Sequence, residues 1–449
     1  MSAARPRHAP GPTGQMLRNL RAFRHDVLGL ILRLMREHGD VARVALGPIT
    51  VHLVSHPDAV KAVLKDVETF DKATLASRMI RPLTGLSILI ENGERWRRNR
   101  RLMQPAFTPG RMLAFLPLIT REAAQVSERW RALARSGEPV DVASEMMQLT
   151  YRVVEGALFG SRTQHGLEEI EQAASESLAY LYGGVRRGFH VPVVVPTRAN
   201  RRFQAARAVL DRRVQELVDE HRREPRDDLL GRLIRAEHES GGARLDDGEL
   251  RDEAVTMLVA GHETTANALT WLWYLLAQHR DEAERVRAEL QAVLGGRAPT
   301  VEDLPRLAAT ERAIQEAMRL YTPIWAIVRN AARDAEIGGY ALEAGSRVVV
   351  SPYAVHRHPE FWDEPERFRP ERFEPALSAA RHSYAYIPFG GGPRVCIGQH
   401  LATLEALVIV AVLAQEWRLA LVPDHPVEID AGITLRAKHG LRMTLEPVR

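Results

Sequence analysis

The segment FGGGPRVCIG, residues 389–398, contains four glycines, one arginine and the single cysteine of the 449-residue chain. Glycine lets a backbone turn tightly and approach another group closely. A strongly apolar segment with helical character follows, so unpaired N–H groups and the positive end of a helix dipole are expected near Cys396. Together with the charge of Arg394, these features favour a thiolate over a thiol. Cys396 is therefore predicted to be an anionic ligand or a nucleophile.

Two chemistries remain compatible with such a sulfur. A nucleophilic cysteine needs a nearby base, usually histidine, and His400 follows about one helical turn later. This favours a cysteine hydrolase. The number of glycines instead favours a large, flat group lying against the loop, because a small acyl substrate would need no such clearance.

The longest predicted helix covers residues 246–279, and its apolar pattern is interrupted by AGHETT at residues 260–265. Glycine, a carboxylate and two hydroxyls are poor choices for the middle of a buried helix. One interpretation is a solvated turn of a surface helix. The other is a helix locally opened at Gly261, with Thr264 facing a cavity and Glu263 beside it as an acid–alcohol pair that moves protons.

Two weaker pairs lie on other predicted helices. Glu316 and Arg319 place opposite charges at i,i+3 spacing, although most such pairs are exposed and contribute under about 1 kcal/mol. Trp96 and Arg100, at i,i+4 spacing, could clamp a carboxylate with an indole N–H and a guanidinium. Neither pair identifies a function alone.

Taken together and in chain order, these motifs resemble those of the cytochrome P-450 family of haem-thiolate monooxygenases. The matching patterns are WxxxR at 96–100, [AG]Gx[DE]T[TS] at 260–265, ExxR at 316–319, PERF at 370–373 and FxxGxRxCxG at 389–398. The resemblance implies a mainly α fold with small β sheets. It also implies a flexible tail over residues 1–16 and one domain over residues 17–449. In that domain, heme b would lie between the long central helix on one side and the Cys loop and last helix on the other.

The resemblance also implies residue roles. Cys396 would be the axial thiolate ligand of the haem iron, and Thr264 with Glu263 would deliver protons. A structural network would consist of Glu316, Arg319 and Arg372. The residues expected to bind the cofactor are Trp96, Arg100, Ala260, Arg329, Phe389, Gly390, Arg394 and Gly398.

The implied reaction uses O2 and inserts one oxygen atom into a largely apolar small molecule. The expected pocket residues are Leu89, Val259, Ile324, Trp325 and Ile433. Their apolar character favours a terpenoid or a fatty acid, with a macrolide or steroid as the alternative. A peroxygenase that uses H2O2, or a non-oxygenating haem protein, is the alternative from a different class.

Electrons would come from NAD(P)H through separate proteins, because a chain ending at residue 449 is too short for a fused reductase. A ferredoxin or flavodoxin with its reductase is expected, docking on the four arginines around Trp96, which are Arg95, Arg97, Arg98 and Arg101, together with Arg394 of the Cys loop.

Composition supports an ordinary globular protein. The formal net charge is +4, the basic residues are spread along the chain, and nucleic-acid binding is not expected. A single cysteine excludes an intrachain disulfide. The Pro- and Ala-rich N-terminus does not resemble a signal peptide, and no apolar run is long enough for a membrane span. We therefore expect a cytoplasmic monomer.

Overall fold

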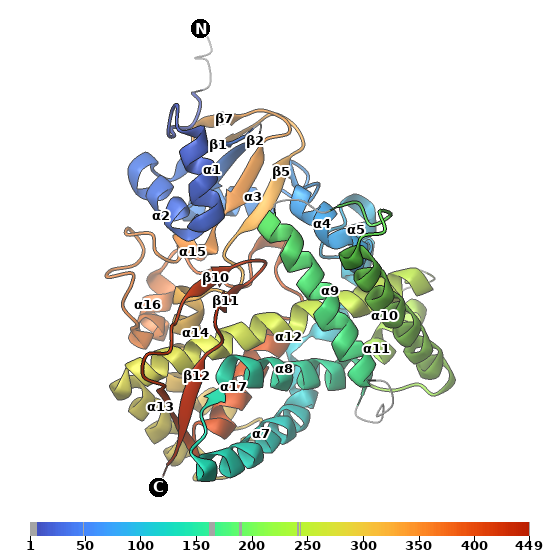
Figure 1. Ribbon diagram of the computed structural model, residues 1–449, viewed down its shortest axis with the longest axis vertical. Helices are drawn as coiled ribbons and strands as arrows, with labels where there is room; N and C mark the ends of the chain where they lie inside the picture. The colour runs from blue at the N-terminus through green and yellow to red at the C-terminus, as the bar shows by residue number, and fades with distance from the viewer. Residues whose placement is uncertain are drawn as a thin grey trace. The chain divides into compact units, whose positions relative to one another are not determined.

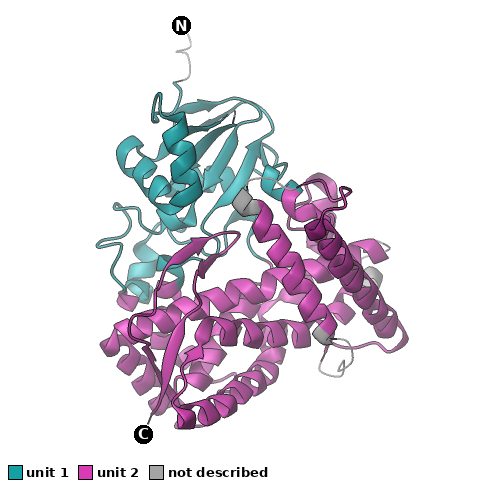
Figure 2. Cartoon of the chain, in the orientation of Figure 1, with its two compact units in different colours: residues 1–78, 318–368, 372–396 teal, residues 79–317, 369–371, 397–449 magenta. Residues whose placement is uncertain are grey.

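The computed structural model describes residues 7–47, 49–160, 167–187, 191–239, 242 and 244–448. The chain divides into two compact units, which Figure 2 shows in different colours. Unit 1 comprises residues 1–78, 318–368 and 372–396, and unit 2 comprises residues 79–317, 369–371 and 397–449. Long helices make up most of unit 2, whereas the largest sheet belongs to unit 1 (Figure 1). The predicted mainly α fold with small β sheets is confirmed.

Unit 1 is built on a five-stranded sheet of order β1-β2-β8-β5-β3. The apolar runs at residues 41–46 and 49–54, separated by a Gly-Pro pair, predict a β-hairpin. It is present: β1 pairs with β2 in antiparallel register, from Val41 opposite Val54 to Leu46 opposite Ile49. Strand β8 then joins β2 in parallel. The strands of unit 1 are β1 (Val41–Leu46), β2 (Ile49–Val54), β3 (Phe70–Asp71), β5 (Ile327–Ala331), β6 (Ala335–Ile337), β7 (Tyr340–Leu342) and β8 (Arg347–Val350).

The alternation of the strand residues explains the core of unit 1. Val41 and Val54 belong to one cluster of buried side chains, and Ala42 and Leu53 to another. Because neighbouring strand residues point to opposite faces, the two clusters cover the two faces of the sheet. The helices of unit 1 are α1 (Met16–His25), α2 (Val27–His38), α3 (Pro57–Lys65), α15 (Pro352–Val355), α16 (Pro375–Ala380) and the short η5 (Gly392–Arg394).

The N-terminal segment differs from the sequence-based expectations in two ways. Apolar and basic residues at helical spacing predict a single helix over residues 17–38. It is instead broken at Asp26, whose carboxylate accepts the N–H of Gly29 and so caps α2. Within the span expected as a flexible tail, Arg7 forms a β-bridge with Tyr340, and Pro10 accepts the N–H of Arg43 at 2.7 Å. One domain over residues 17–449 stays a prediction.

Helices of unit 2 surround the long helix α12 (Asp247–Gln278), with α8 packed alongside it (Figure 1). A capping box starts α12: the carboxylate of Asp246 accepts the N–H of Glu249, whose own carboxylate accepts the N–H of Asp246. The other long helices are α5 (Gly93–Met103), α7 (Leu116–Ser136), α8 (Val142–Phe159), α9 (Leu167–Arg187), α10 (Arg198–Arg223), α11 (Leu229–Glu239), α13 (Arg280–Val293) and α17 (Gln399–Leu413).

Two small sheets and several single turns complete unit 2. Strands β4 (Val140–Asp141), β12 (Arg442–Pro447) and β9 (Trp417–Leu421) form one sheet, and β10 (Ile429–Ala431) with β11 (Leu435–Ala437) forms a hairpin. The single turns are η1 (Gln104–Phe107), α6 (Pro109–Met112), η2 (Leu113–Phe115) and η3 (Leu304–Arg306). Three elements contain a boundary between the units: α4 (Leu75–Thr84), α14 (Ala308–Leu320) and η4 (Pro370–Phe373). Among the described residues, no helix is both long and apolar enough to cross a bilayer.

Candidate functional site

The Cys396 loop of unit 1 is a compact turn that leaves its cysteine accessible. The amide of Cys396 donates to the carbonyl of Phe389 at 3.0 Å, and the amide of Val395 donates to the carbonyl of Gly392 at 3.1 Å. Cys396 is exposed, and helix α17 begins three residues later in the chain. The loop therefore stabilises its own backbone while it presents the sulfur to an external group.

Contacts inside unit 1 explain two of the loop glycines. Gly392 has a φ of +67°, and a Cβ there would lie 2.3 Å from the carbonyl oxygen of Leu64 at the end of α3. A Cβ on Gly391 would lie 2.8 Å from the ring of Tyr384. These glycines let the loop pack on its own protein. The expectation that the glycine count reflects clearance for a flat group is thus wrong for these two positions.

Three cations of unit 1 interact around this loop. Arg329 is buried, its Nη1 donates to the carbonyl of Val328 at 3.1 Å, and its Nε has no hydrogen-bond partner among the described residues. Burial lowers the pKa of Arg329 to about 10. Burial, followed by the charges of Arg329 and Arg394, lowers the pKa of Lys72 well below its ordinary value. A group of cations with an unsatisfied buried donor favours an anionic ligand.

These residues fit the cofactor that the sequence resemblance implies. A haem carries carboxylate side groups, and the grouped cations would bind such groups, while the exposed thiol would serve as the iron ligand. The residues that the resemblance implies for cofactor binding include Arg329 and Arg394 but not Lys72. Its one distinguishing signal is that lysine occurs at only four positions, 61, 65, 72 and 438, in a chain rich in arginine.

The predicted acid–alcohol pair lies on a continuous α12. The hydroxyl of Thr264 donates to the carbonyl of Ala260 at 2.9 Å, one turn earlier on the helix. Ala260 is exposed and Thr264 is partly exposed, whereas most of this helix is buried. The carbonyl of Ala260 and the hydroxyl of Thr264 therefore form an accessible polar site on a mostly buried helix, as expected for residues that face a ligand.

The expected opening of α12 at Gly261 is not present. Residues 247–278 are helical throughout. A Cβ on Gly261 would lie 3.1 Å from a methyl group of Val154 on α8, closer than most such contacts. Gly261 therefore allows α8 and α12 to pack closely, and this packing, rather than a break in the helix, explains the glycine.

The carboxylate of Glu263 is buried and belongs to a side-chain network in unit 2. Its Oε1 accepts hydrogen bonds from the hydroxyl of Tyr182 on α9 and from the hydroxyl of Thr434 at 2.7 Å. The amide of Asn267 donates to the Thr434 hydroxyl at 3.0 Å. Burial and the charge of Glu263 raise the pKa of Tyr182, which keeps the phenol protonated.

The predicted carboxylate clamp lies on α5. Trp96 is buried, Arg100 is one turn later and partly exposed, and Arg100 Nε donates to the side chain of Gln104 at 3.0 Å. The i,i+4 spacing places both side chains on one side of the helix, as the sequence predicted.

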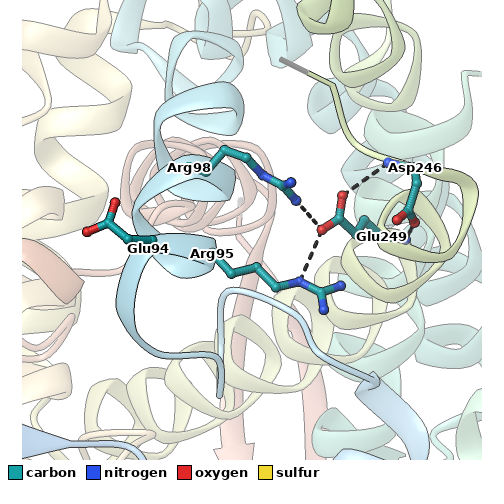
Figure 3. A pocket seen from close by; sticks show the side chains of 5 residues that line it. All are labelled: Glu94, Arg95, Arg98, Asp246 and Glu249. Carbon is teal, nitrogen blue, oxygen red and sulfur yellow. Dashed lines mark hydrogen bonds and ion pairs between the residues drawn. The ribbon is translucent and has the colours of Figure 1, made fainter.

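A charged surface pocket lies where α5 approaches the start of α12. Arg95 and Arg98 point toward Glu249, which is also part of the capping box with Asp246 (Figure 3). The distance from Arg95 Nε to the Glu249 carboxylate is 3.1 Å, and Arg98 also pairs with it. Two of the four α5 arginines expected to dock a redox partner therefore stabilise an internal helix start.

The other two arginines differ in their surroundings. Arg97 pairs with Glu94 on the same helix, whereas Arg101 is exposed. Because Arg95, Arg97 and Arg98 pair with carboxylates, α5 offers less positive charge to a partner protein than the sequence suggested. Within the expected docking surface, the exposed Arg101 contributes most of that charge.

The residues of the predicted structural network make several hydrogen bonds to the backbone. Arg319 is fully buried and donates to the carbonyls of His356, Pro365 and Arg367 at 2.7–3.0 Å. Arg372 donates to the carbonyl of Glu364 at 2.8 Å. In unit 2, Glu316 accepts the N–H of Arg369 at 2.8 Å. These side chains hold irregular backbone segments in place, because such segments lack the hydrogen bonds of regular structure.

The predicted substrate residues are accessible to different degrees. Leu89 is exposed, and Val259 and Ile433 are partly exposed in unit 2. In unit 1, Ile324 is partly exposed, and Trp325 packs against the sheet core beside α2. The contact of Trp325 with that core is a structural role that the pattern did not suggest.

The loop that carries Leu89 is fixed by two acids of α12. The N–H of Leu86 donates to Asp252 at 2.7 Å, and the N–H of Ile88 donates to Glu253 at 2.8 Å. Sequence reasoning missed both acids, because nothing local connects residues 165 positions apart. The loop is thus held through its backbone, independently of its side chains.

Comparison with a family model described as Cytochrome P450 gives a match over residues 10–441. Among solved structures, the crystal structure of the cytochrome P450DA heme domain is similar, with a TM-score of 0.90 and 26% sequence identity. That likeness covers 98% of this chain and 97% of the other.

Three characterised relatives are similar over most of their lengths. The chain is 34% identical over 416 residues to cyclooctatin synthase of Streptomyces melanosporofaciens, covering 92% of this chain and 88% of the relative. It is 39% identical over 396 residues to cyclooctat-9-en-7-ol 5-monooxygenase of the same organism, covering 86% and 84%. It is 33% identical over 413 residues to pentalenene oxygenase of Streptomyces avermitilis, covering 91% and 90%.

Proposed function

The chain belongs to the cytochrome P450 family, and on that premise we propose that it is a terpenoid monooxygenase in which Cys396 is the thiolate ligand of a haem iron. A monooxygenase activity and a haem cofactor accord with the family. When bound, the haem supplies O2 activation through an iron whose thiolate ligand donates electron density. The cysteine-hydrolase alternative is set aside.

The observation that carries the assignment is the group of cations at the loop that contains the exposed Cys396. Arg329 and Lys72 have pKa values lowered by burial, so each would gain a favourable interaction from a carboxylate. Arg394 belongs to the same loop as Cys396 and adds to this charge. We assign the haem carboxylates to these cations, with Trp96 and Arg100 as further hydrogen-bond donors to the carboxylates. The residues assigned to contact the haem ring are Ala260, Phe389, Gly390 and Gly398.

The proton-handling role falls to Thr264 and Glu263. Thr264 is accessible on α12, and its hydroxyl can exchange its bond to the Ala260 carbonyl for a bond to a ligand. Glu263 is the adjacent acid. This pair counts against the peroxygenase alternative, because an enzyme that receives H2O2 has no need to deliver protons to O2.

A terpenoid is the substrate class best supported. The three named relatives are a cyclooctatin synthase, a cyclooctat-9-en-7-ol 5-monooxygenase and a pentalenene oxygenase, and all are similar across most of the chain. The expected wall residues Leu89, Val259, Ile324 and Ile433 are apolar and accessible, which suits a hydrocarbon skeleton. A fatty acid is the next candidate and a macrolide or steroid the one after it.

The proposal also covers the electron source, the location in the cell and the oligomeric state of the enzyme. Electrons come from NAD(P)H through a ferredoxin or flavodoxin and its reductase, and the enzyme works as a cytoplasmic monomer. The exposed Arg101 is the residue on α5 best placed to attract an acidic partner.

The deciding experiment is an absorption spectrum of the purified, reduced protein with CO. We expect the thiolate-type spectrum in the wild type and its loss in Cys396→Ala, with the helical content unchanged by circular dichroism. A thiolate-type spectrum retained in Cys396→Ala would overturn the assignment. Titration with terpenoids and fatty acids, followed by the substrate-induced spin shift, then separates the substrate classes.

A further inference from the structure

The surroundings of Glu263 show which parts of unit 2 control this carboxylate. Tyr182 comes from α9, Thr434 from the turn between β10 and β11, and Asn267 from the next turn of α12. All four side chains are buried. Glu263, which is expected to handle protons, is therefore hydrogen-bonded to two elements far from it in sequence, α9 and the turn between β10 and β11.

The hydroxyl oxygens of Tyr182 and Thr434 both contact Oε1 of Glu263, and they lie 2.8 Å from each other. Each hydroxyl has one proton, which it can donate to Glu263 or to the other hydroxyl. The Tyr182 oxygen accepts the N–H of Thr434 at 3.3 Å, and the Thr434 oxygen accepts from Asn267. The arrangement suits a carboxylate with two hydroxyl donors, and removing either donor would leave a buried charge less well satisfied.

The β10–β11 hairpin encloses the Tyr182 ring. A Cβ on Gly432 would lie 2.4 Å from the ring, and the guanidinium carbon of Arg436 lies 4.2 Å from the ring centroid. Arg436 is in turn held by Asp430 at 2.9 Å. The ring and the hairpin therefore fit together closely, and a shift of one requires a shift of the other.

Ile433 connects this network to the expected substrate pocket. It lies between Gly432 and Thr434 at the tip of the hairpin and is partly exposed. A ligand that presses on Ile433 would move Thr434 and, through the enclosed ring, Tyr182. The position of the Glu263 carboxylate would then depend on what occupies the pocket.

We propose that Tyr182 and Thr434 are positioning residues that hold Glu263 for proton delivery and make its placement respond to a ligand at the β10–β11 hairpin. The proposal rests on the proposed function, because it assumes that Glu263 handles protons for a monooxygenase. Neither residue touches the reacting atoms; both act through Glu263.

Tyr182→Phe tests the proposal because it keeps the ring inside the hairpin and removes only the hydroxyl. The matched control is Tyr180→Phe on the same helix, where the buried hydroxyl donates to Asn200 at 2.9 Å and the ring stacks on Phe203. We expect product formed per NAD(P)H to fall about fivefold to tenfold in Tyr182→Phe, the size of one typical lost hydrogen bond. Tyr180→Phe should match the wild type.

A double-mutant cycle separates positioning from a general structural effect. If Tyr182 acts through Glu263, then Tyr182→Phe should have no further effect on product per NAD(P)H in a Glu263→Gln background. Fold-losses that multiply in the double variant, or equal coupling in Tyr182→Phe and Tyr180→Phe, would overturn the proposal.

Hydrogen exchange provides a readout that does not depend on turnover. Exchange of residues 429–437 should be faster in Tyr182→Phe and Thr434→Val than in the wild type or Tyr180→Phe, and a bound apolar ligand should alter it in the wild type. Unchanged exchange in both variants would also overturn the proposal. A wild type without the thiolate-type CO spectrum would refute the proposed function instead, and the exchange experiment distinguishes these two failures.

Discussion

The carboxylate of Glu253 on α12 accepts the backbone N–H of Ile88 at 2.8 Å, while its second oxygen is buried and has no hydrogen-bond partner in the part of the chain that the structure describes. Burial raises the pKa of Glu253 to about 8, and the charges of Asp252 and Glu249 act in the same direction. This acid holds the loop that carries Leu89, so its protonation state affects that loop directly.

Glu253→Gln should stabilise the protein at pH 8 and have little effect near pH 5. The folded protein keeps Glu253 protonated up to about pH 8, whereas the unfolded chain ionises it above its ordinary pKa of 4.5. The wild type therefore loses stability as the pH rises between these values. Glutamine imitates the protonated acid and removes the loss, about 2–4 kcal/mol at pH 8.

Urea unfolding of both proteins at pH 5 and pH 8 measures this difference. The exposed Glu446→Gln serves as the control and should show no pH-dependent difference from the wild type. Equal stabilities of Glu253→Gln and the wild type at pH 8 would contradict the raised pKa.

Thr264→Val should uncouple the enzyme without unfolding it. Valine keeps the shape of threonine but cannot donate a hydrogen bond, so protons would no longer be guided by this hydroxyl. We expect NAD(P)H consumption to be largely maintained, product per NAD(P)H to fall about tenfold, and H2O2 to increase. One assay that follows product, peroxide and NAD(P)H together gives the answer.

Thr270→Val is the matched control for this variant. Its hydroxyl also donates to a carbonyl one turn earlier, that of Ala266 at 2.8 Å, but the residue is buried elsewhere on α12. If Thr264→Val and Thr270→Val show the same coupling at full haem content, Thr264 has no role in proton delivery.

Lys72→Met should stabilise the haem-free protein and weaken haem retention. Burial, and after it the charges of Arg329 and Arg394, lower the pKa of Lys72, so the folded protein disfavours the charge of this lysine. Methionine removes that unfavourable charge, but it also removes a cation that would bind a haem carboxylate.

Thermal unfolding of the haem-free protein and the rate of haem loss to a scavenger protein measure the two effects. We expect a higher melting temperature and haem loss faster by about tenfold, one lost charge-assisted bond. Lys61→Met should change neither. Lower stability of the haem-free variant, or unchanged haem loss, would separate Lys72 from the cofactor site.

Arg101→Glu should slow reduction by an acidic redox partner and leave stability unchanged, since Arg101 is exposed. Arg98→Glu should instead destabilise the protein, because it places a carboxylate against Glu249. Stopped-flow reduction at several salt concentrations tests the first statement, and the rate in Arg101→Glu should depend less steeply on salt. Identical rates and salt dependences in Arg101→Glu and the wild type would exclude this part of α5 from docking.

The sequence predicted the elements with a strong local pattern. The hairpin at residues 41–54 and helix α12 follow directly from apolar alternation and from helical spacing with an acidic start. Helices α3, α4, α9 and α11 were missed. In α9, Gly183 and Gly184 lower helix propensity, and contacts with α10, such as the stack of Tyr180 on Phe203, supply the missing stability.

The candidate site was predicted only where a motif marks it. The cytochrome P450 fold that the motifs implied is confirmed by the TM-score of 0.90. The roles assigned to Cys396, Thr264 and Glu263 stay predictions. The partners of these residues could not be predicted, because Tyr182 lies 81 positions before Glu263 and Thr434 lies 171 positions after it. Only the folded chain brings such residues together.

The close fit of Gly392 against the backbone of Leu64 also limits how this chain can be recombined with its relatives. The contact has two partners, the Cys396 loop and the end of α3. If a chimaera takes only the loop from one parent protein, the loop loses the α3 segment against which it was packed. A crossover that takes residues 389–396 from one parent and residues 57–65 from another combines surfaces that were never selected together. Chimaeras that inherit both segments from the same parent should fold more often than chimaeras that separate them, and haem incorporation across a recombination library would reveal this linkage.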